Sequence, residues 1–184
     1  MAFPTDTVYG VGALAFDSEA VERVYWAKDR PVEKAIPVLL GESLQLEAVA
    51  SDVPERARLL AARFWPGPLT LVVGKKRSVP RAVAAGATLG VRVPDHPTAL
   101  ALLHGAGPMA VTSANLSGQP SAQTAAEVLE QLDGKVDLIL DGGRTPGGIA
   151  STIVDCTQAD LRILRLGPVS LEDLQAALGS KNAD

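Results

Sequence analysis

The amino-acid sequence predicts a single-domain α/β fold, and three observations support this class. The chain has 184 residues, a length typical of one domain. Hydrophobic residues make up 47% of the chain, which is enough for a sizeable core and argues against disorder. Short apolar runs alternate with helical patterns, and no repeat or low-complexity linker separates them. We therefore expect one domain over residues 1–184.

Six apolar runs rich in Val, Ile and Leu are predicted to form β-strands. In chain order they cover residues 69–73, 89–93, 109–112, 137–140, 152–155 and 162–166. Before Phe3 the chain leaves little room for an opening strand.

Five helices are predicted from capping residues and apolar periodicity. They cover residues 17–28, 52–64, 97–104, 124–134 and 170–179. The first begins at Asp17 or Ser18, residue types that accept hydrogen bonds from the first helical turn. The fourth begins with the capping-box pattern of Thr124 and Glu127, and the last begins with a weaker version of it at Ser170.

The overall composition argues against several classes of function. The net charge is −4 and aromatic residues make up 4%, unlike a general polyanion binder or a base-stacking surface. Cys156 is the single cysteine, and no histidine spacing suits a metal site. No apolar stretch reaches the roughly 18 residues of a membrane span, and no leader pattern is visible. We expect a cytoplasmic protein with no membrane partner and no metal site of its own.

Three common motifs do not fit the chain. Gly10, Gly12 and Ala15 have the spacing of a dinucleotide fingerprint, but a full strand does not fit before them. Residues 142–148 have the glycines of a P-loop but lack its lysine. No GxSxG segment or triad-like histidine context indicates a serine hydrolase.

Four polar segments interrupt the apolar runs where the chain is expected to change direction. They are PTDTVYG at residues 4–10, KDRP at 28–31, TSANLSG at 112–118 and GGIAST at 147–152. Small polar side chains beside glycines let the backbone approach a ligand, and Lys28 and Arg30 can bind phosphate or carboxylate. The same residue types are common in simple turns. Four such segments in one domain favour a ligand site.

Several residues outside these segments have more than one interpretation. Arg92 lies inside an apolar strand, where it either faces solvent or clamps an anion near the strand end. Asp95 or His96 is better explained as the cap of the following helix than as a catalytic residue. Residues 75–77 form a short basic run that is typical of a solvated loop.

Together, these pieces resemble the YrdC-like family of threonylcarbamoyl-AMP synthases. The matching segments are PTDTVYG at residues 4–10, KxRP at 28–31, FWPGPLTL at 64–71, VRxPDHP at 91–97, TSANxSG at 112–118 and ILRxGxVS within 162–170. They cover nearly the whole chain in order. The combination of the first and fifth segments is far more specific than a glycine motif alone.

The resemblance implies a twisted, open, mixed α/β sheet with flanking helices and a large concave face. It implies the condensation of L-threonine, bicarbonate and ATP to L-threonylcarbamoyl-adenylate with release of pyrophosphate, which is a nucleotidyl transfer. Mg²⁺ would arrive with ATP. A separate transferase would use the product to form threonylcarbamoyladenosine in tRNA.

The resemblance also implies roles for individual residues. The expected L-threonine ligands are Thr5, Arg92, Ser113 and Ser151, and the expected ATP ligands are Lys28, Thr88, Asn115, Gln123 and Arg165. Arg30 is expected beside the phosphates, and Lys28 and Arg30 are the residues implied for catalysis. Adenylate formation depends mainly on positioning and charge stabilisation, so no acid–base pair is required.

The sequence departs from the family pattern at several positions. From the sequence as it stands we expect the helix and the body of the strand that normally precede PTDT to be missing, and a short form of the family with no extra C-terminal domain. Asp29 replaces a usual glycine, Ala35 and Ile36 replace a Pro-Leu pair, and Gln123 replaces a small hydroxyl residue near ATP.

Two alternatives to the synthase remain open. The same fold can serve as a non-catalytic module that binds double-stranded RNA or tRNA, although the negative net charge counts against it. A second enzyme of this fold makes carbamoyl-adenylate from carbamoyl phosphate, within the much longer hydrogenase-maturation proteins. Dependence on threonine separates the two enzymes, and salt-sensitive RNA binding without ATP turnover identifies the module.

Overall fold

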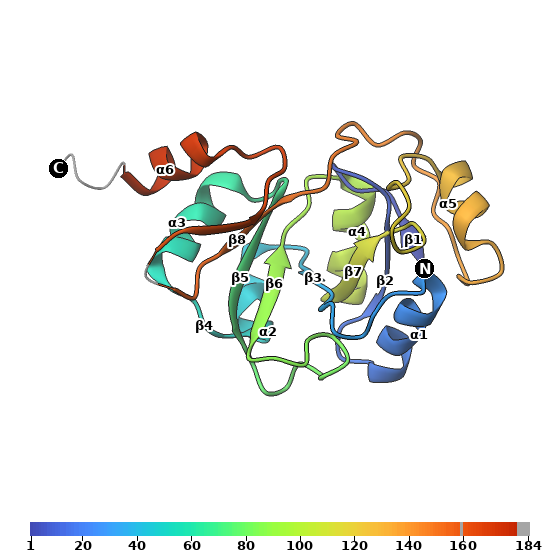
Figure 1. Ribbon diagram of the computed structural model, residues 1–184, viewed down its shortest axis with the longest axis horizontal. Coiled ribbons are helices and arrows are strands. Elements are labelled where there is room, and N and C mark those ends of the chain that lie inside the picture. Colours follow the sequence, from blue (N-terminus) through green and yellow to red (C-terminus); the bar gives the residue numbers. More distant parts are fainter. Residues whose placement is uncertain (159, 180–184) are drawn as a thin grey trace.

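One mixed β-sheet runs through the molecule, and the helices lie behind it or at its two sides in the view of Figure 1. The computed structural model describes residues 1–158 and 160–179. Within this part, the strands are β1 (Ala2–Phe3), β2 (Gly10–Leu14), β3 (Val38–Leu39), β4 (Ala50–Asp52), β5 (Leu69–Lys75), β6 (Thr88–Arg92), β7 (Met109–Ser113), β8 (Thr152–Asp155) and β9 (Arg162–Arg165). The helices are α1 (Ser18–Lys28), α2 (Leu46–Val49), α3 (Glu55–Phe64), α4 (Pro97–Ala106), α5 (Ala125–Leu132) and α6 (Leu171–Gly179), with a 3₁₀ turn at Ser43–Gln45.

The sheet is open and mixed, as the sequence predicts. Its strand order is β1-β2-β7-β3-β6-β5-β8-β9, and β4 pairs with β5 beside this path. The β3–β6 and β5–β8 pairs are parallel, whereas the other pairs are antiparallel. No helix in the described residues is long and apolar enough to cross a membrane.

The core is centred on β5, where Leu69, Leu71 and Val73 have no exposed surface. Leu71 lies opposite Val91 of β6 and Val154 of β8, so three strands meet in register there. Helix α3 packs against β5, and α6 packs against α3. This apolar packing fixes the strand ends on which the polar segments lie.

Five of the predicted strands are present as β5 to β9, but the prediction of a strand at residues 137–140 is wrong. In that segment Ile139 forms only an isolated bridge with Ala2. The N–H of Ala2 donates to the Leu138 carbonyl at 2.7 Å, and the N–H of Leu140 donates to the Ala2 carbonyl at 2.9 Å. The pairing stops there because β1 has only two residues and is followed by Pro4, which has no N–H to donate.

Strands β1 to β4 were not predicted from the sequence, and β2 shows why. Gly10 and Gly12 weaken the strand signal, yet both lie in β2. A Cβ atom on Gly12 would lie 2.4 Å from the carbonyl oxygen of Ala110 in β7. Glycine at this position therefore permits close strand pairing, and Gly10 and Gly12 lie inside a strand rather than in a turn that leads into a helix.

The five predicted helices are all present, and their caps explain where they begin. The Asp17 carboxylate accepts from the Ala20 N–H at 3.0 Å at the start of α1. The Thr124 hydroxyl accepts from the Glu127 N–H at 3.2 Å at the start of α5. The predicted start of the second helix at Asp52 is wrong, because Asp52 belongs to β4 and α3 begins three residues later.

The predicted cap of the helix after Arg92 is confirmed in position. His96 is the N-cap residue of α4, but its side chain makes no capping hydrogen bond. Helix α4 extends to Ala106, slightly beyond the predicted end.

Candidate functional site

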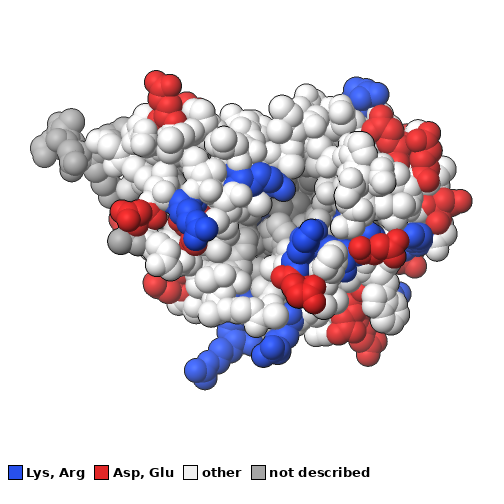
Figure 2. Space-filling view, in the orientation of Figure 1, with Lys and Arg blue, Asp and Glu red and all other residues white. Residues whose placement is uncertain are grey.

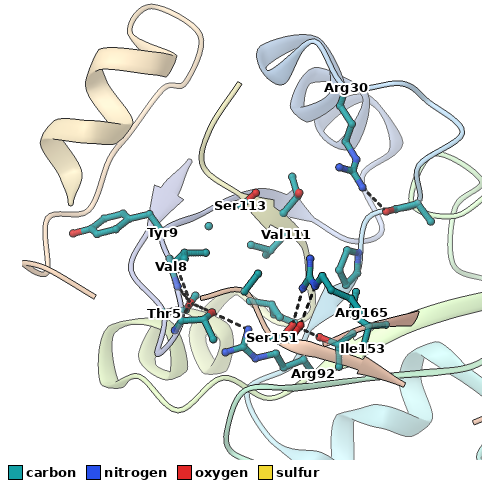
Figure 3. Close-up of a pocket in the computed structure, with 18 residues that line it drawn as sticks. Thr5, Val8, Tyr9, Arg30, Arg92, Val111, Ser113, Ser151, Ile153 and Arg165 are labelled. Carbon is teal, nitrogen blue, oxygen red and sulfur yellow. Dashed lines mark hydrogen bonds between the residues drawn. The ribbon is translucent and has the colours of Figure 1, made fainter. Parts of the chain in front are cut away.

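A cavity of about 210 Å³ lies where several strands end (Figures 2 and 3). Each of the four polar segments contributes to its wall, through Thr5, Arg30, Ser113 and Ser151 respectively. Arg92 and Arg165 complete the charged part of the lining. Figure 2 shows basic side chains beside the hollow. The structure therefore joins segments that are far apart in the sequence around one space.

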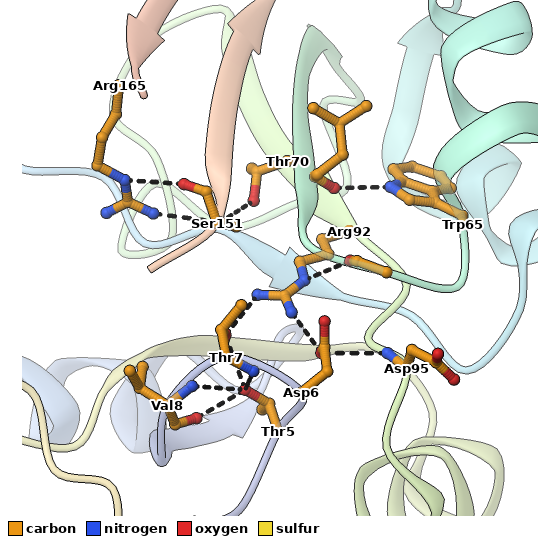
Figure 4. A network of polar contacts seen from close by, with 12 residues as sticks. Thr5, Asp6, Thr7, Val8, Trp65, Thr70, Arg92, Asp95, Ser151 and Arg165 are labelled. Carbon is orange, nitrogen blue, oxygen red and sulfur yellow. Dashed lines mark hydrogen bonds and ion pairs between the residues drawn. The ribbon is translucent and has the colours of Figure 1, made fainter. Parts of the chain in front are cut away.

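The segment before β2 forms a chain of hydrogen bonds in which every donor is defined (Figure 4). The Thr5 hydroxyl donates to the Val8 carbonyl at 2.6 Å and lies 3.0 Å from the Thr7 hydroxyl. Arg92 Nη1 donates to Thr7 Oγ1 at 3.1 Å. A guanidinium can only donate, and the Thr5 proton is already used, so the Thr7 hydroxyl must donate to Thr5. Thr7, which sequence reasoning missed, thus connects Arg92 to the turn.

Arg92 is a buried cation, with 5% of its surface exposed. Its Nε donates to the Gly67 carbonyl at 2.8 Å, and its Nη2 forms an ion pair with Asp6 Oδ1. Burial lowers the pKa of the guanidinium, while the charge of Asp6 acts in the opposite direction. A charge inside an apolar strand is costly unless it is paired, and Asp6 pairs with this one.

Ser151 lies at the centre of a second group of polar contacts (Figures 3 and 4). Its hydroxyl is 2.8 Å from the Thr70 hydroxyl and accepts from Arg165 Nη2 at 3.1 Å. Arg165 Nε also donates to the Ser151 carbonyl at 3.0 Å. Whichever hydroxyl donates to the other, one of the two protons remains available. Ser151 and Thr70, both in the cavity wall, can therefore offer one hydroxyl donor to a ligand.

Lys28 lies behind the cavity wall and is 1% exposed. Its ammonium donates to the backbone carbonyls of Ser113 and Asn115. Burial, and to a lesser degree the charge of Arg30, lowers its pKa to about 8. Lys28 therefore stabilises the end of β7 and the loop after it, where two other predicted site residues, Ser113 and Asn115, lie.

Arg30 lines the cavity on the side of its own loop. Its Nε donates to the Lys34 carbonyl at 3.0 Å, and its Nη2 donates to the Ala35 carbonyl at 2.9 Å. Burial lowers the pKa of both Arg30 and Arg165, and the charge of Arg30 lowers that of Arg165 further. Within residues 1–158 and 160–179, neither arginine forms an ion pair. This side of the cavity is therefore suited to a polyanion.

Besides Lys28, three other residues predicted to bind ATP lie outside this cavity wall. Thr88 is exposed at the start of β6. Asn115 is buried, and its Nδ2 donates to the Gln119 carbonyl at 2.9 Å. Gln123 Oε1 accepts from Arg144 Nη1 at 3.1 Å. The cavity therefore holds only part of the predicted set.

Sequence reasoning missed Asp6, Thr7 and Thr70 as contributors to the site. All three lie inside motifs that the sequence analysis singled out, so the motifs themselves were the available signal. Their importance comes from contacts with residues 81 to 86 positions away along the chain.

Other reactive groups in the described part of the chain do not form a second site. No group of three or more His, Cys, Asp or Glu residues there could hold a metal ion. Burial raises the pKa of the Cys156 thiol to about 11, so it is almost entirely protonated near neutral pH.

Comparison with known sequences identifies relatives along the whole chain. Residues 1–167 match the Sua5_yciO_yrdC family, described as "Telomere recombination". A threonylcarbamoyl-AMP synthase of Pyrococcus abyssi is 45% identical over 97% of this chain and 53% of its own length. A Bacillus subtilis enzyme of the same name is 43% identical over 100% of this chain and 54% of its own length. The chain thus spans about half the length of these two relatives.

Two solved structures are also similar to this chain. P. abyssi Sua5 complexed with L-threonine has a TM-score of 0.94 and 45% identity, covering 97% of this chain and 53% of that one. Escherichia coli YciO has a TM-score of 0.83 and 29% identity, covering 94% of this chain and 85% of that one.

Proposed function

The chain belongs to the Sua5/YciO/YrdC family, and from this premise we propose that it is a threonylcarbamoyl-AMP synthase. The observation that carries the proposal is the division of one cavity into two chemically different sides. Small hydroxyl groups and a paired arginine, Arg92, line one part of the wall. Arg30 and Arg165 line the other part, and Arg165 donates to Ser151 where the two parts meet. An amino acid suits the first side and a triphosphate suits the second.

The proposed reaction joins three substrates. The amino group of L-threonine attacks the carbon of bicarbonate, so that a C–N bond forms and water is lost. An oxygen of the resulting carbamate attacks the α-phosphorus of ATP, and the bond to pyrophosphate breaks. The protein's task is to hold the carbamate and the α-phosphate in line and to stabilise the charge that develops, as in other phosphoryl and nucleotidyl transfers.

We assign the amino-acid side of the cavity to Thr5, Arg92, Ser113 and Ser151. Arg92 offers N–H donors to the carboxylate of threonine, and the Ser151–Thr70 pair offers a hydroxyl donor. The Thr5 hydroxyl is bonded to the Val8 carbonyl, so Thr5 contributes mainly through the shape of its turn.

We assign the nucleotide side to Arg30 and Arg165, with Lys28 supporting it from behind. Thr88, Asn115 and Gln123 are proposed to contact the remainder of ATP, and Mg²⁺ bound to the nucleotide would offset part of the phosphate charge. The product would pass to a separate transferase that modifies tRNA, which is a cytoplasmic process.

The test is release of pyrophosphate from ATP and bicarbonate, measured with and without L-threonine. Serine serves as a control for the amino acid, and carbamoyl phosphate serves as a control for a carbamoyl-adenylate enzyme. Release that requires threonine, together with the mass of threonylcarbamoyl-AMP, supports the proposal. Release that requires carbamoyl phosphate instead, or RNA binding with no ATP turnover, contradicts it.

A further inference from the structure

Asp6 influences the cavity through its contact with the lining residue Arg92. It does not line the cavity, but its Oδ1 pairs with Arg92 Nη2 and accepts from the Asp95 N–H at 3.1 Å. Two other bonds, to Gly67 and Thr7, hold the same guanidinium. A guanidinium has five N–H donors, so two remain for a ligand.

The carboxylate of Asp6 is not explained by stability alone. Its second oxygen, Oδ2, is buried and makes no hydrogen bond within the described residues. An unsatisfied buried carboxylate oxygen disfavours folding. The negative charge offsets that of the buried Arg92, and it also lowers the attraction of this guanidinium for a further anion.

Charge is distributed unevenly around the cavity. Arg92 is the one lining arginine with a carboxylate partner in the part of the chain that the structure describes, whereas Arg30 and Arg165 bond only to carbonyl and hydroxyl oxygens. The Arg92–Asp6 pair is therefore close to neutral as a unit, whereas Arg30 and Arg165 keep their positive charge. A phosphate dianion is attracted to an unpaired cation more strongly than a carboxylate is, and a paired cation largely removes this advantage.

We propose that Asp6 is a specificity-determining positioning residue that neutralises Arg92 and so keeps phosphate out of the amino-acid side of the cavity. The two remaining N–H donors of Arg92 still suit a carboxylate, whose two oxygens accept hydrogen bonds in parallel. The nucleotide phosphates are left to Arg30 and Arg165. This inference rests on the proposed function for the identity of the carboxylate as that of L-threonine.

Asp6→Asn tests the charge, because it keeps the size of the side chain and one oxygen acceptor. Calorimetry measures the affinity of the wild type and the variant for inorganic phosphate alone, and then the displacement of L-threonine by phosphate. We expect phosphate to bind and to compete about tenfold more strongly in Asp6→Asn, with a smaller effect at high salt. A variant that merely loosens the loop would bind every ligand more weakly.

Two further variants control the experiment. Asp95→Asn removes the same charge from an exposed neighbour and is expected to leave phosphate competition unchanged. Asp6→Glu keeps the charge and is expected to restore exclusion of phosphate. Asp6→Ser, which is also uncharged, replaces Asp6→Asn if thermal melting shows that Asn prevents folding.

Unchanged or weaker phosphate binding in the uncharged variants overturns the inference, as does an equal gain in Asp95→Asn. Failure of the wild type to bind L-threonine contradicts the proposed function instead. The titration with phosphate alone still tests the role of Asp6 in that case.

Discussion

Arg92 and Arg30 line the same cavity, but the protein holds them in opposite ways. The partners of Arg92 lie 25, 85 and 86 positions away along the chain, whereas Arg30 bonds to carbonyls only four and five residues ahead. The orientation of Arg92 is thus set by the tertiary structure, and that of Arg30 by its own loop. Arg92 is preorganised for its ligand by distant parts of the chain, while Arg30 depends on local backbone geometry.

The largest expected effect follows from replacing Arg92, which distant parts of the chain hold in place. Arg92→Met leaves the Asp6 carboxylate buried without its cation, so the free energy of unfolding is expected to fall by about 3 kcal/mol. Denaturant titration measures the loss. In the double variant Arg92→Met with Asp6→Asn, part of the stability is expected to return. Equal losses in the single and double variants would show that the ion pair is not the cause.

Removing the locally held arginine is expected to affect catalysis rather than folding. Arg30→Ala removes a positive charge beside the proposed phosphates. We expect kcat/KM to fall by the factor that corresponds to a loss of about 2–4 kcal/mol in transition-state stabilisation. The unfolding midpoint is expected to change little, because the partners of Arg30 are carbonyls of its own loop. Turnover near that of the wild type contradicts the assignment.

The buried Lys28 is expected to make the free energy of unfolding depend on pH. Its pKa of about 8 lies below the ordinary value of 10.5 because of burial, so the unfolded chain binds more protons between these two values. The Lys28 contribution to stability is therefore expected to rise from about pH 8 to about pH 10.5. Unfolding of the wild type and of Lys28→Met measures the difference across this range. A difference that stays constant with pH would show that the lysine is not desolvated in the fold.

A smaller effect is expected from the second group of polar contacts. Thr70→Val removes the hydroxyl partner of Ser151 while keeping the side-chain shape, so binding of L-threonine is expected to weaken by about 1 kcal/mol. Ser151→Ala and the double variant complete a cycle. Strictly additive losses would show that the two hydroxyl groups do not act together.

The smallest effect concerns the backbone between Lys28 and Arg30. Asp29 has a φ of 51° and a ψ of 42°, which is the left-handed conformation that favours glycine. Asp29→Gly is therefore expected to stabilise the protein by about 0.5 kcal/mol. Glycine adopts this φ without strain, and this gain exceeds the cost of the greater conformational entropy that glycine gives the unfolded chain. Thermal unfolding measures it. A loss of stability would show that the exposed contact of Asp29 with Lys135 matters more.

The sequence predicts the parts of the fold that depend on local signals. Capping residues such as Asp17 and Thr124 locate helix starts, and apolar runs rich in Val, Ile and Leu locate β5 to β9. Strands β1 and β3 have two residues each and carry no periodic signal, and β2 contains glycines that are needed only because β7 lies close to them.

The site divides in the same way, into features that local sequence signals predict and features that depend on tertiary contacts. The polar segments that meet at the cavity were visible as clusters of residue types. The pairing of Asp6 and Thr7 with Arg92, and of Thr70 with Ser151, was not predictable, because it depends on which strand ends become neighbours.

The most direct test of a cavity with two different sides is to measure L-threonine and ATP binding separately in Arg92→Lys and Arg165→Gln. We expect Arg92→Lys to weaken threonine binding while ATP binding is largely kept, since lysine cannot reproduce the fork of donors. We expect Arg165→Gln to weaken ATP binding more than threonine binding. Equal loss of both ligands in both variants would contradict the division of the cavity.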